Sequence, residues 1–242
     1  MTPTRETVES RGETPAVVTV RVVRVFTDQA GNHGNPLGVV EDAATTVPDP
    51  AHRQEIAARL GYSETVFIDD TATSTISIYT PRTKIPFAGH PAVGAAWFLG
   101  RIHGTPQDVL RTEGGDARTW TDDNGVWVRA ALASTPPWWH ERLDDPKQVD
   151  DLTGPLHPGQ DFTQLWAWED EDAGTIRVRT FADRVGIPED EACGSGAMRL
   201  TAALGRPLTL HHGKGSIIHA RPGPPGHADI GGTVTEDEPR TL

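Results

Sequence analysis

The 242-residue sequence is poor in several residue types, and each scarcity excludes a class of protein. It has one cysteine, Cys193, so no disulfide can form within the chain. Lys and Arg number 22 against 34 Asp and Glu, a formal net charge of −12. Such an acidic chain lacks the basic face that nucleic-acid binding needs. Apolar runs stay well short of the ~18 residues of a membrane-spanning helix. We therefore expect a cytoplasmic protein with no nucleic-acid or membrane partner.

Residues 1–16 are polar and have no apolar stretch of the kind found in a signal peptide, so we expect a disordered leader there. The rest of the chain alternates between β-branched runs and short helical patterns. The β-branched runs predict strands at 17–26, 37–40, 66–69, 74–79, 118–121, 126–130, 165–168, 176–181, 217–220 and 229–234. Helical patterns predict helices at 50–60, 91–100 and 194–204, with loops at 86–90 and 186–192.

Two distant segments look alike. IPFAGHPAVGA at 85–95 and IPEDEACGSGA at 187–197 each combine an Ile-Pro loop, a glycine, a polar residue and a small-residue helix. The match indicates an internal duplication. We expect an α+β fold of two pseudo-symmetric halves, 17–105 and 106–242, each a curved, mostly antiparallel sheet around a central helix. The site would lie in the cleft between the halves.

The two repeated segments also predict where the chemistry takes place. A helix N-terminus presents free backbone N–H groups and a partial positive charge, which suits a carboxylate or an enolate-like oxygen. Gly89 and Gly194 would let the backbones of two such ends approach closely. His90 and Ser195 follow them at corresponding positions and could donate hydrogen bonds into the cleft.

Glu64, between a helix stop and an apolar strand, is the candidate base, because partial burial raises the pKa of a carboxyl group. Taken one at a time, these residues also have ordinary interpretations. A lone Glu64 could be a surface charge and His90 a loop histidine. Cys193 could be a small buried apolar residue, and Asp190 a helix cap.

Other apparent signals are weak. His211, His212 and His219 have no Cys or carboxylate at metal-ligand spacing, so no metal site is predicted. Gly213–Ser216 lacks the full spacing of a phosphate-binding loop. The pair Trp138-Trp139 is interpreted as a packing or interface patch.

From about Val20 to Val234 the chain resembles the phenazine-biosynthesis isomerase family (PhzF-like), which has the diaminopimelate epimerase fold. The resemblance rests on the order and spacing of VFT (25–27), GNPL (34–37), SETVF (63–67), PFAGHP (86–91) and GIPED (186–190) leading to Gly194-Ser195. It implies an isomerase without cofactor or metal, which moves a proton and a double bond on a small carboxylate-bearing metabolite. It also implies a homodimer with a role in secondary-metabolite or antibiotic biosynthesis.

The resemblance assigns roles to individual residues. Glu64 matches the catalytic acid/base of the family, and His90, Asp190 and Ser195 match its supporting polar residues. The resemblance also implies substrate contacts, which fall on Asn35, Gly89, Cys193, Gly194 and Gly196.

Cys193 departs from the family pattern, which usually has Thr there. ACGSGA at 192–197 looks instead like the second cysteine motif of diaminopimelate epimerase, while Ala88 stands where the first cysteine would be. A two-thiol epimerase mechanism is therefore excluded. An amino-acid epimerase using Glu64 and Cys193 is an alternative, because a helix N-terminus should lower the pKa of Cys193. A non-catalytic small-molecule binding protein is another. The second half also looks shortened between Trp139 and Phe162.

Overall fold

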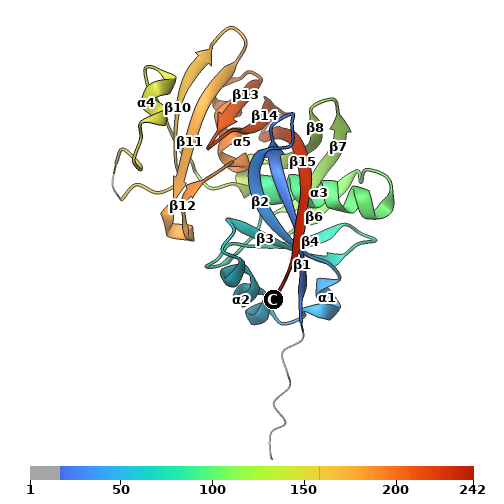
Figure 1. Cartoon of the computed structure of the whole chain (residues 1–242). Helices are drawn as coiled ribbons and strands as arrows, with labels where there is room; N and C mark the ends of the chain where they lie inside the picture. Colours follow the sequence, from blue (N-terminus) through green and yellow to red (C-terminus); the bar gives the residue numbers. More distant parts are fainter. Residues whose placement is uncertain (1–16, 158) are drawn as a thin grey trace, which may run out of the picture.

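The computed structural model describes residues 17–157 and 159–242, and the predicted leader at 1–16 lies outside them. The described chain forms one mixed, mostly antiparallel sheet of 15 strands, with helices packed against it (Figure 1). This agrees with the predicted α+β class. Within the described residues, no helix combines the length and the apolar character that crossing a bilayer would take.

The strands are β1 (Thr19–Thr27), β2 (His33–Val40), β3 (Glu64–Asp70), β4 (Thr75–Tyr79), β5 (Lys84–Ile85), β6 (Val109–Thr112), β7 (Gly115–Asp122), β8 (Gly125–Ala131), β9 (Trp139–Arg142), β10 (Thr163–Asp170), β11 (Thr175–Ala182), β12 (Ile187–Asp190), β13 (Leu208–His212), β14 (Ser216–Pro222) and β15 (His227–Thr241). The α-helices are α1 (Ala43–Thr46), α2 (Pro50–Leu60), α3 (Gly89–His103), α4 (Pro146–Asp150) and α5 (Gly194–Leu204). Two 3-10 turns, η1 (Leu132–Ser134) and η2 (Asp183–Val185), complete the set.

Local sequence signals explain most of these elements. The predicted hairpins β1–β2, β7–β8 and β10–β11 all form. Helix α2 begins after Asp49, whose carboxylate accepts two backbone N–H groups, and ends at Gly61 in the left-handed region (φ +67°). Helix α5 has the predicted bounds and ends at Gly205 (φ +66°).

Three sequence predictions need correction. Helix α3 begins at Gly89 rather than Pro91 and runs to His103, because a proline in the first turn removes only an N–H that has no helical partner. Part of the predicted loop 186–192 is the short strand β12, which pairs with β11. The last strand is also much longer than residues 229–234, because its polar end pairs with β1.

The internal repeat is visible in the strand pairing. In the first set, β2 is parallel to β3, β3 and β4 are antiparallel, and α3 connects to β6, which is parallel to β4. In the second set, β9 is parallel to β10, β10 and β11 are antiparallel, and α5 connects to β13, which is parallel to β11. The predicted boundary near residue 105 falls just after α3, and the sheet continues across it from β4 to β6.

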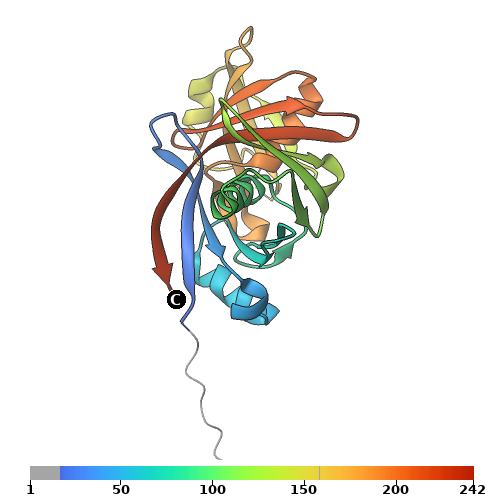
Figure 2. The ribbon, with the colours of Figure 1, turned by 90° about the vertical axis from the view of Figure 1, so that its right-hand side faces the viewer.

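Strand β15 connects the two sets. It pairs with β1 along one edge and with β8 and β14 farther along. The pairing of β1 with β15 closes the path β1-β2-β3-β4-β6-β7-β8-β15 into a ring. Figure 2 looks roughly along α3, which lies among these strands. Helix α3 contacts β1, β2, β3, β8 and β15, which fits its small-residue sequence, buried from Gly89 to Ala96 and again at Phe98 and Leu99.

One large core extends through both sets, from Val93 and Leu99 on α3 to Met198 and Leu200 on α5. A smaller apolar cluster lies beneath α1 and α2, around Ile56 and Phe67. Helices α3 and α5 are in direct contact, so the two sets form a single packed unit around their central helices.

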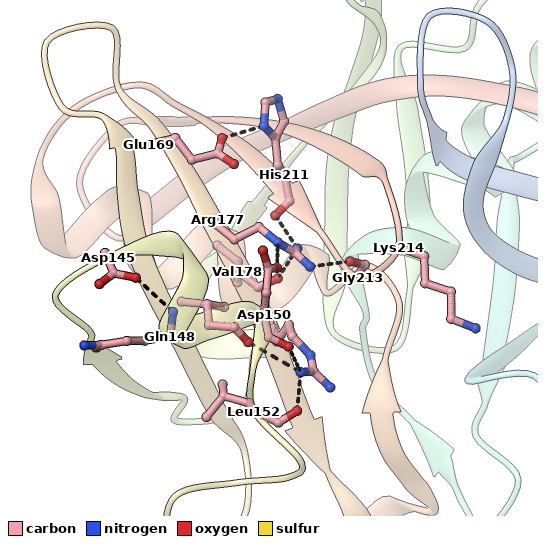
Figure 3. Close-up of polar contacts among 12 residues, drawn as sticks. Asp145, Gln148, Asp150, Leu152, Glu169, Arg177, Val178, His211, Gly213 and Lys214 are labelled. Atoms are coloured by element: carbon pink, nitrogen blue, oxygen red, sulfur yellow. Dashed lines mark hydrogen bonds and ion pairs between the residues drawn. The ribbon is translucent and has the colours of Figure 1, made fainter.

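Two arginines on β11 fix the outer segment that contains α4 (Figure 3). Arg177 Nε bonds Asp150 at 2.7 Å, and the same guanidinium donates to the carbonyls of His211 and Gly213. Arg179 Nη1 donates to three carbonyls at the end of α4, at Val149, Asp150 and Leu152. Its Nε and Nη2 bond the two carboxylate oxygens of Glu189, at 2.7 and 2.8 Å. Since Glu189 precedes Asp190, Arg179 connects α4 to the strand that carries a predicted catalytic residue.

Candidate active site

The N-terminal ends of α3 and α5 meet, as the repeated motif predicts. A Cβ on Gly194 would lie 2.9 Å from Gly89 Cα and from the backbone nitrogen of His90, and a Cβ on Gly89 would lie 2.8 Å from Gly194. Only glycine allows the two backbones to approach so closely. Within the described residues no side chain caps α3, which leaves its first N–H groups for a ligand.

Glu64 and His90 form a buried pair. Glu64 is the first residue of β3, and His90 is the second residue of α3. Glu64 Oε2 lies 2.9 Å from His90 Nδ1, and the two residues are 7% and 2% exposed. A carboxylate at this distance favours the tautomer with a proton on Nδ1, which then donates to Glu64. The histidine therefore orients the carboxylate, as expected for a positioned acid/base.

Asp190 approaches the same place from the second set. It ends β12 and accepts a hydrogen bond from Asn35 Nδ2 at 2.6 Å, while Asn35 Oδ1 accepts one from Ser63. Burial, and next the charge of Glu64, raises the pKa of Asp190 to about 6. Two carboxyl groups in one site, one of them with a raised pKa, are suited to act as an acid and a base. Asn35 lies behind Asp190 and holds it in place.

Cys193 caps α5, since its Sγ accepts the backbone N–H of Gly196 at 3.4 Å. The predicted fall in the pKa of this thiol is wrong. Burial, and next the charge of Asp190, raises the pKa of Cys193 well above its ordinary value. Desolvation outweighs the partial positive charge of the helix end. Cys193 therefore stays a neutral thiol. The helix cap that the sequence suggested as an alternative role for Asp190 is in fact Cys193.

A chain of buried polar side chains, His212, Thr180 and Gln164, is hydrogen-bonded to the backbone at the start of α5. His212 Nε2 accepts the backbone N–H of Cys193 at 3.4 Å and lies 3.1 Å from Thr180 Oγ1, which accepts from Gln164. Burial lowers the pKa of His212 to about 3, so its ring stays neutral and keeps this acceptor. His212 thus fixes the position of the helix end. A metal role is not visible: in the described chain, no three His, Cys, Asp or Glu side chains gather in a way that could hold a metal ion.

The site opens into a cavity of about 330 Å³. Four predicted residues line it, namely Glu64, Asp190, Cys193 and Ser195. Apolar and aromatic side chains make up much of the remaining lining, among them Ile85, Phe87, Pro136, Trp138, Phe162 and Ile187. In the described chain no Lys, Arg or His joins this lining. An anionic ligand would therefore depend on backbone N–H groups and hydroxyls.

The other predicted residues lie around the cavity rather than in its lining. His90 and Asn35 hold the two carboxyl groups, while Gly89, Gly194 and Gly196 lie in the first turns of α3 and α5. Sequence reasoning missed Trp138, whose indole Nε1 donates to Ser195 Oγ at 2.9 Å. It also missed Phe162, whose ring packs against Trp138. The signal for Trp138 was the Trp138-Trp139 pair, interpreted as a packing or interface patch, and Phe162 had no comparable signal.

The chain is similar to a known family and to several known proteins. The chain matches the PhzC-PhzF family, described as phenazine biosynthesis-like protein, over residues 23–149. It is 28% identical over 220 residues to a trans-2,3-dihydro-3-hydroxyanthranilate isomerase of Pseudomonas fluorescens, with 75% of this chain and 78% of that protein covered.

Two solved structures have the same fold. A PhzF-family protein of Enterococcus faecalis superposes with a TM-score of 0.74 at 17% identity, covering 94% of this chain and 99% of that one. A predicted epimerase of Pseudomonas aeruginosa gives a TM-score of 0.65 at 22% identity, with 93% and 99% covered.

Because the family match spans more than half of the sequence, the chain belongs to the PhzC-PhzF family of phenazine biosynthesis-like proteins. It is an enzyme of the isomerase class, with the fold shared by PhzF proteins and epimerases.

Proposed function

We propose that this isomerase works without a cofactor and moves a proton, together with a double bond, on a small carboxylate-bearing metabolite. The observation that carries the proposal is the buried Glu64–His90 pair together with Asp190, with both carboxyl groups lining one cavity. Glu64, held by His90, takes a proton from a substrate carbon. Asp190, with its raised pKa, returns a proton at a second carbon. Exchange with solvent then removes the proton from Glu64 and restores the one on Asp190, so both groups are ready for the next turnover. The N-terminal ends of α3 and α5 stabilise the negative charge that develops in between.

A first candidate substrate is trans-2,3-dihydro-3-hydroxyanthranilate, which the Pseudomonas fluorescens relative is named for. It is a small carboxylate, and the cavity of about 330 Å³ suits a molecule of that size. A role in secondary-metabolite or antibiotic biosynthesis belongs to this proposal. Cytoplasmic location and homodimer formation remain predictions. Trp139, 53% exposed, is the part of the Trp pair that is still open to an interface.

The test is exchange with solvent. In D2O, the wild-type enzyme should transfer deuterium to carbon of trans-2,3-dihydro-3-hydroxyanthranilate as it isomerises, followed by NMR and mass spectrometry. Glu64→Gln should keep the fold and lose this incorporation, because an amide cannot carry the proton. Glu55→Gln, on the exposed face of α2, is the matched control. Unchanged deuterium uptake in Glu64→Gln would exclude Glu64 as the proton carrier.

An amino-acid epimerase is the second candidate, because Cys193 lines the same cavity as Glu64. Two observations weaken it: burial keeps Cys193 a neutral thiol, and Ala88 occupies the place of a second cysteine. Cys193→Ala decides between the two, since it should abolish inversion by an epimerase and leave a Glu64-based proton shift largely active. A non-catalytic binding protein would instead return the ligand chemically unchanged after long incubation.

A further inference from the structure

Trp138 lies just before β9, and backbone hydrogen bonds fix the chain at this residue and at the next one. Its own N–H donates to Pro136 O at 3.0 Å, and the next N–H, of Trp139, donates to Phe162 O at 2.8 Å. The indole ring meets Phe162 edge to face, with the ring centres 5.3 Å apart and the planes at 87°. The Trp138 ring is therefore a fixed part of the cavity wall.

The hydrogen bond from the Trp138 indole determines which role is left for the Ser195 hydroxyl. An indole nitrogen can only donate, so the hydroxyl oxygen of Ser195 is the acceptor in this 2.9 Å contact. The hydroxyl proton of Ser195 must then be directed elsewhere. The other hydrogen-bonding contact of this hydroxyl is with Cys193 Sγ at 3.6 Å, and sulfur in a neutral thiol accepts weakly. The proton of Ser195 is thus available to a ligand in the cavity.

We propose that Trp138 is a positioning residue, which makes the hydroxyl of Ser195 a hydrogen-bond donor to the substrate carboxylate. The proposal rests on the proposed function, because it takes Ser195 to contact the substrate. Ser195 is the second residue of α5, so its hydroxyl lies in the first turn of that helix, at the end whose partial positive charge favours an anion. Among the described residues, the cavity lining has two carboxyl groups and no basic side chain, so this single donor should contribute more to carboxylate binding than one neutral hydrogen bond usually does.

The test is a double-mutant cycle with Trp138→Phe, Ser195→Ala and the pair. Phenylalanine keeps a ring against Phe162 and loses the N–H. Anthranilate, a stable aromatic carboxylate, is titrated by calorimetry as a binding probe, and trans-2,3-dihydro-3-hydroxyanthranilate is used for kinetics. Trp139→Phe is the control, because that neighbouring ring is 53% exposed and outside the cavity lining.

We expect Trp138→Phe to weaken anthranilate binding about five- to tenfold, the range of one hydrogen bond. It should raise KM with kcat nearly unchanged, since a substrate carboxylate is held equally before and during the reaction. In the Ser195→Ala background the same change should have almost no further effect. Trp139→Phe should bind as the wild type does.

Independent, multiplying effects of the two substitutions would overturn the proposal, because Trp138 would then act by packing alone. Wild-type protein that fails to bind anthranilate would also overturn it. If the two substitutions are coupled in anthranilate binding but no isomerisation occurs, the proposed reaction fails and the role of Trp138 stands.

Discussion

Gly89 and Gly194 touch through their backbones, one from each copy of the internal repeat. A Cβ on Gly194 would lie 2.9 Å from Gly89 Cα, a distance that real Cβ contacts do not reach. The contact aligns the uncapped end of α3 with the start of α5 beside the cavity. The position of the N–H groups that we propose to bind the substrate anion thus depends on the absence of two side chains.

Gly194→Ala should therefore separate the two helix ends. We expect a loss of about 1–3 kcal/mol in the free energy of unfolding, typical of overpacking, and a loss of activity larger than the change in stability explains. Gly154→Ala is the control, because a Cβ there meets open space. Urea unfolding and a crystal structure of the variant measure both effects. Wild-type activity in Gly194→Ala would mean that this spacing is unimportant.

Asp190 should make stability depend on pH. Its pKa in the fold is about 6 and its ordinary value is 3.8, so between those values the folded state holds more protons than the unfolded state. Stability contributed by this group therefore falls as pH rises from about 4 to about 6, by on the order of 3 kcal/mol. Asp190→Asn should flatten that slope, stabilise the protein near neutral pH and reduce activity. Unfolding curves across this pH range, with exposed Asp116→Asn as control, provide the measurement.

Cys193 should be unreactive in the native protein. A buried thiol with a raised pKa has little thiolate at about pH 8. We expect alkylation by iodoacetamide to be at least about tenfold slower than in the urea-unfolded chain. Cys193→Ser should fold normally, because serine is a favoured residue at a helix N-cap. Rapid alkylation of the folded protein would contradict this prediction, because it would show that Cys193 forms the thiolate that an epimerase needs.

Arg179→Ala should loosen α4 and the strand before Asp190 together. The substitution removes the donor to the carbonyls of Val149, Asp150 and Leu152 and to Glu189. We expect a loss of roughly 1–3 kcal/mol of stability and faster hydrogen exchange in residues 146–152. Arg179→Lys should not restore either, because lysine cannot make the two parallel bonds to Glu189. Exposed Arg59→Ala is the control, and exchange as slow as in the wild type would contradict this role of Arg179.

The sequence predicts those parts of the fold that local chemistry determines. Helix α5 and the three hairpins are marked by small residues, glycine stops and turn residues, and their prediction is confirmed. The polar end of β15, residues 235–241, carries no strand pattern of its own. It becomes a strand because Glu236 and Asp237 meet Arg21 and Arg24 on β1, more than 200 positions earlier. Such a pairing is invisible in a local window.

In the site, too, local motifs could be predicted from the sequence and contacts between distant residues could not. The motifs predict the meeting of Glu64, Asp190, Cys193 and Ser195 at one cavity, and all four line it. The pKa of Cys193 could not be predicted, because the helix end and the burial of the thiol act in opposite directions and only the packed structure shows which is larger. Trp138 was beyond reach because nothing local relates it to Ser195, 57 positions away.

The pairing of β1 with β15 also determines how late in synthesis the fold can be completed. Val20 pairs with Arg240, so the ring of strands around α3 cannot close until almost all of the 242 residues have left the ribosome. Until then the edge of β1 and the apolar surface of α3 lack part of their cover. Contacts between such distant residues form slowly, and an open strand edge of this kind invites aggregation. Folding of newly made chains should therefore depend on chaperone supply, and deletion of residues 235–241 should uncover the edge of β1.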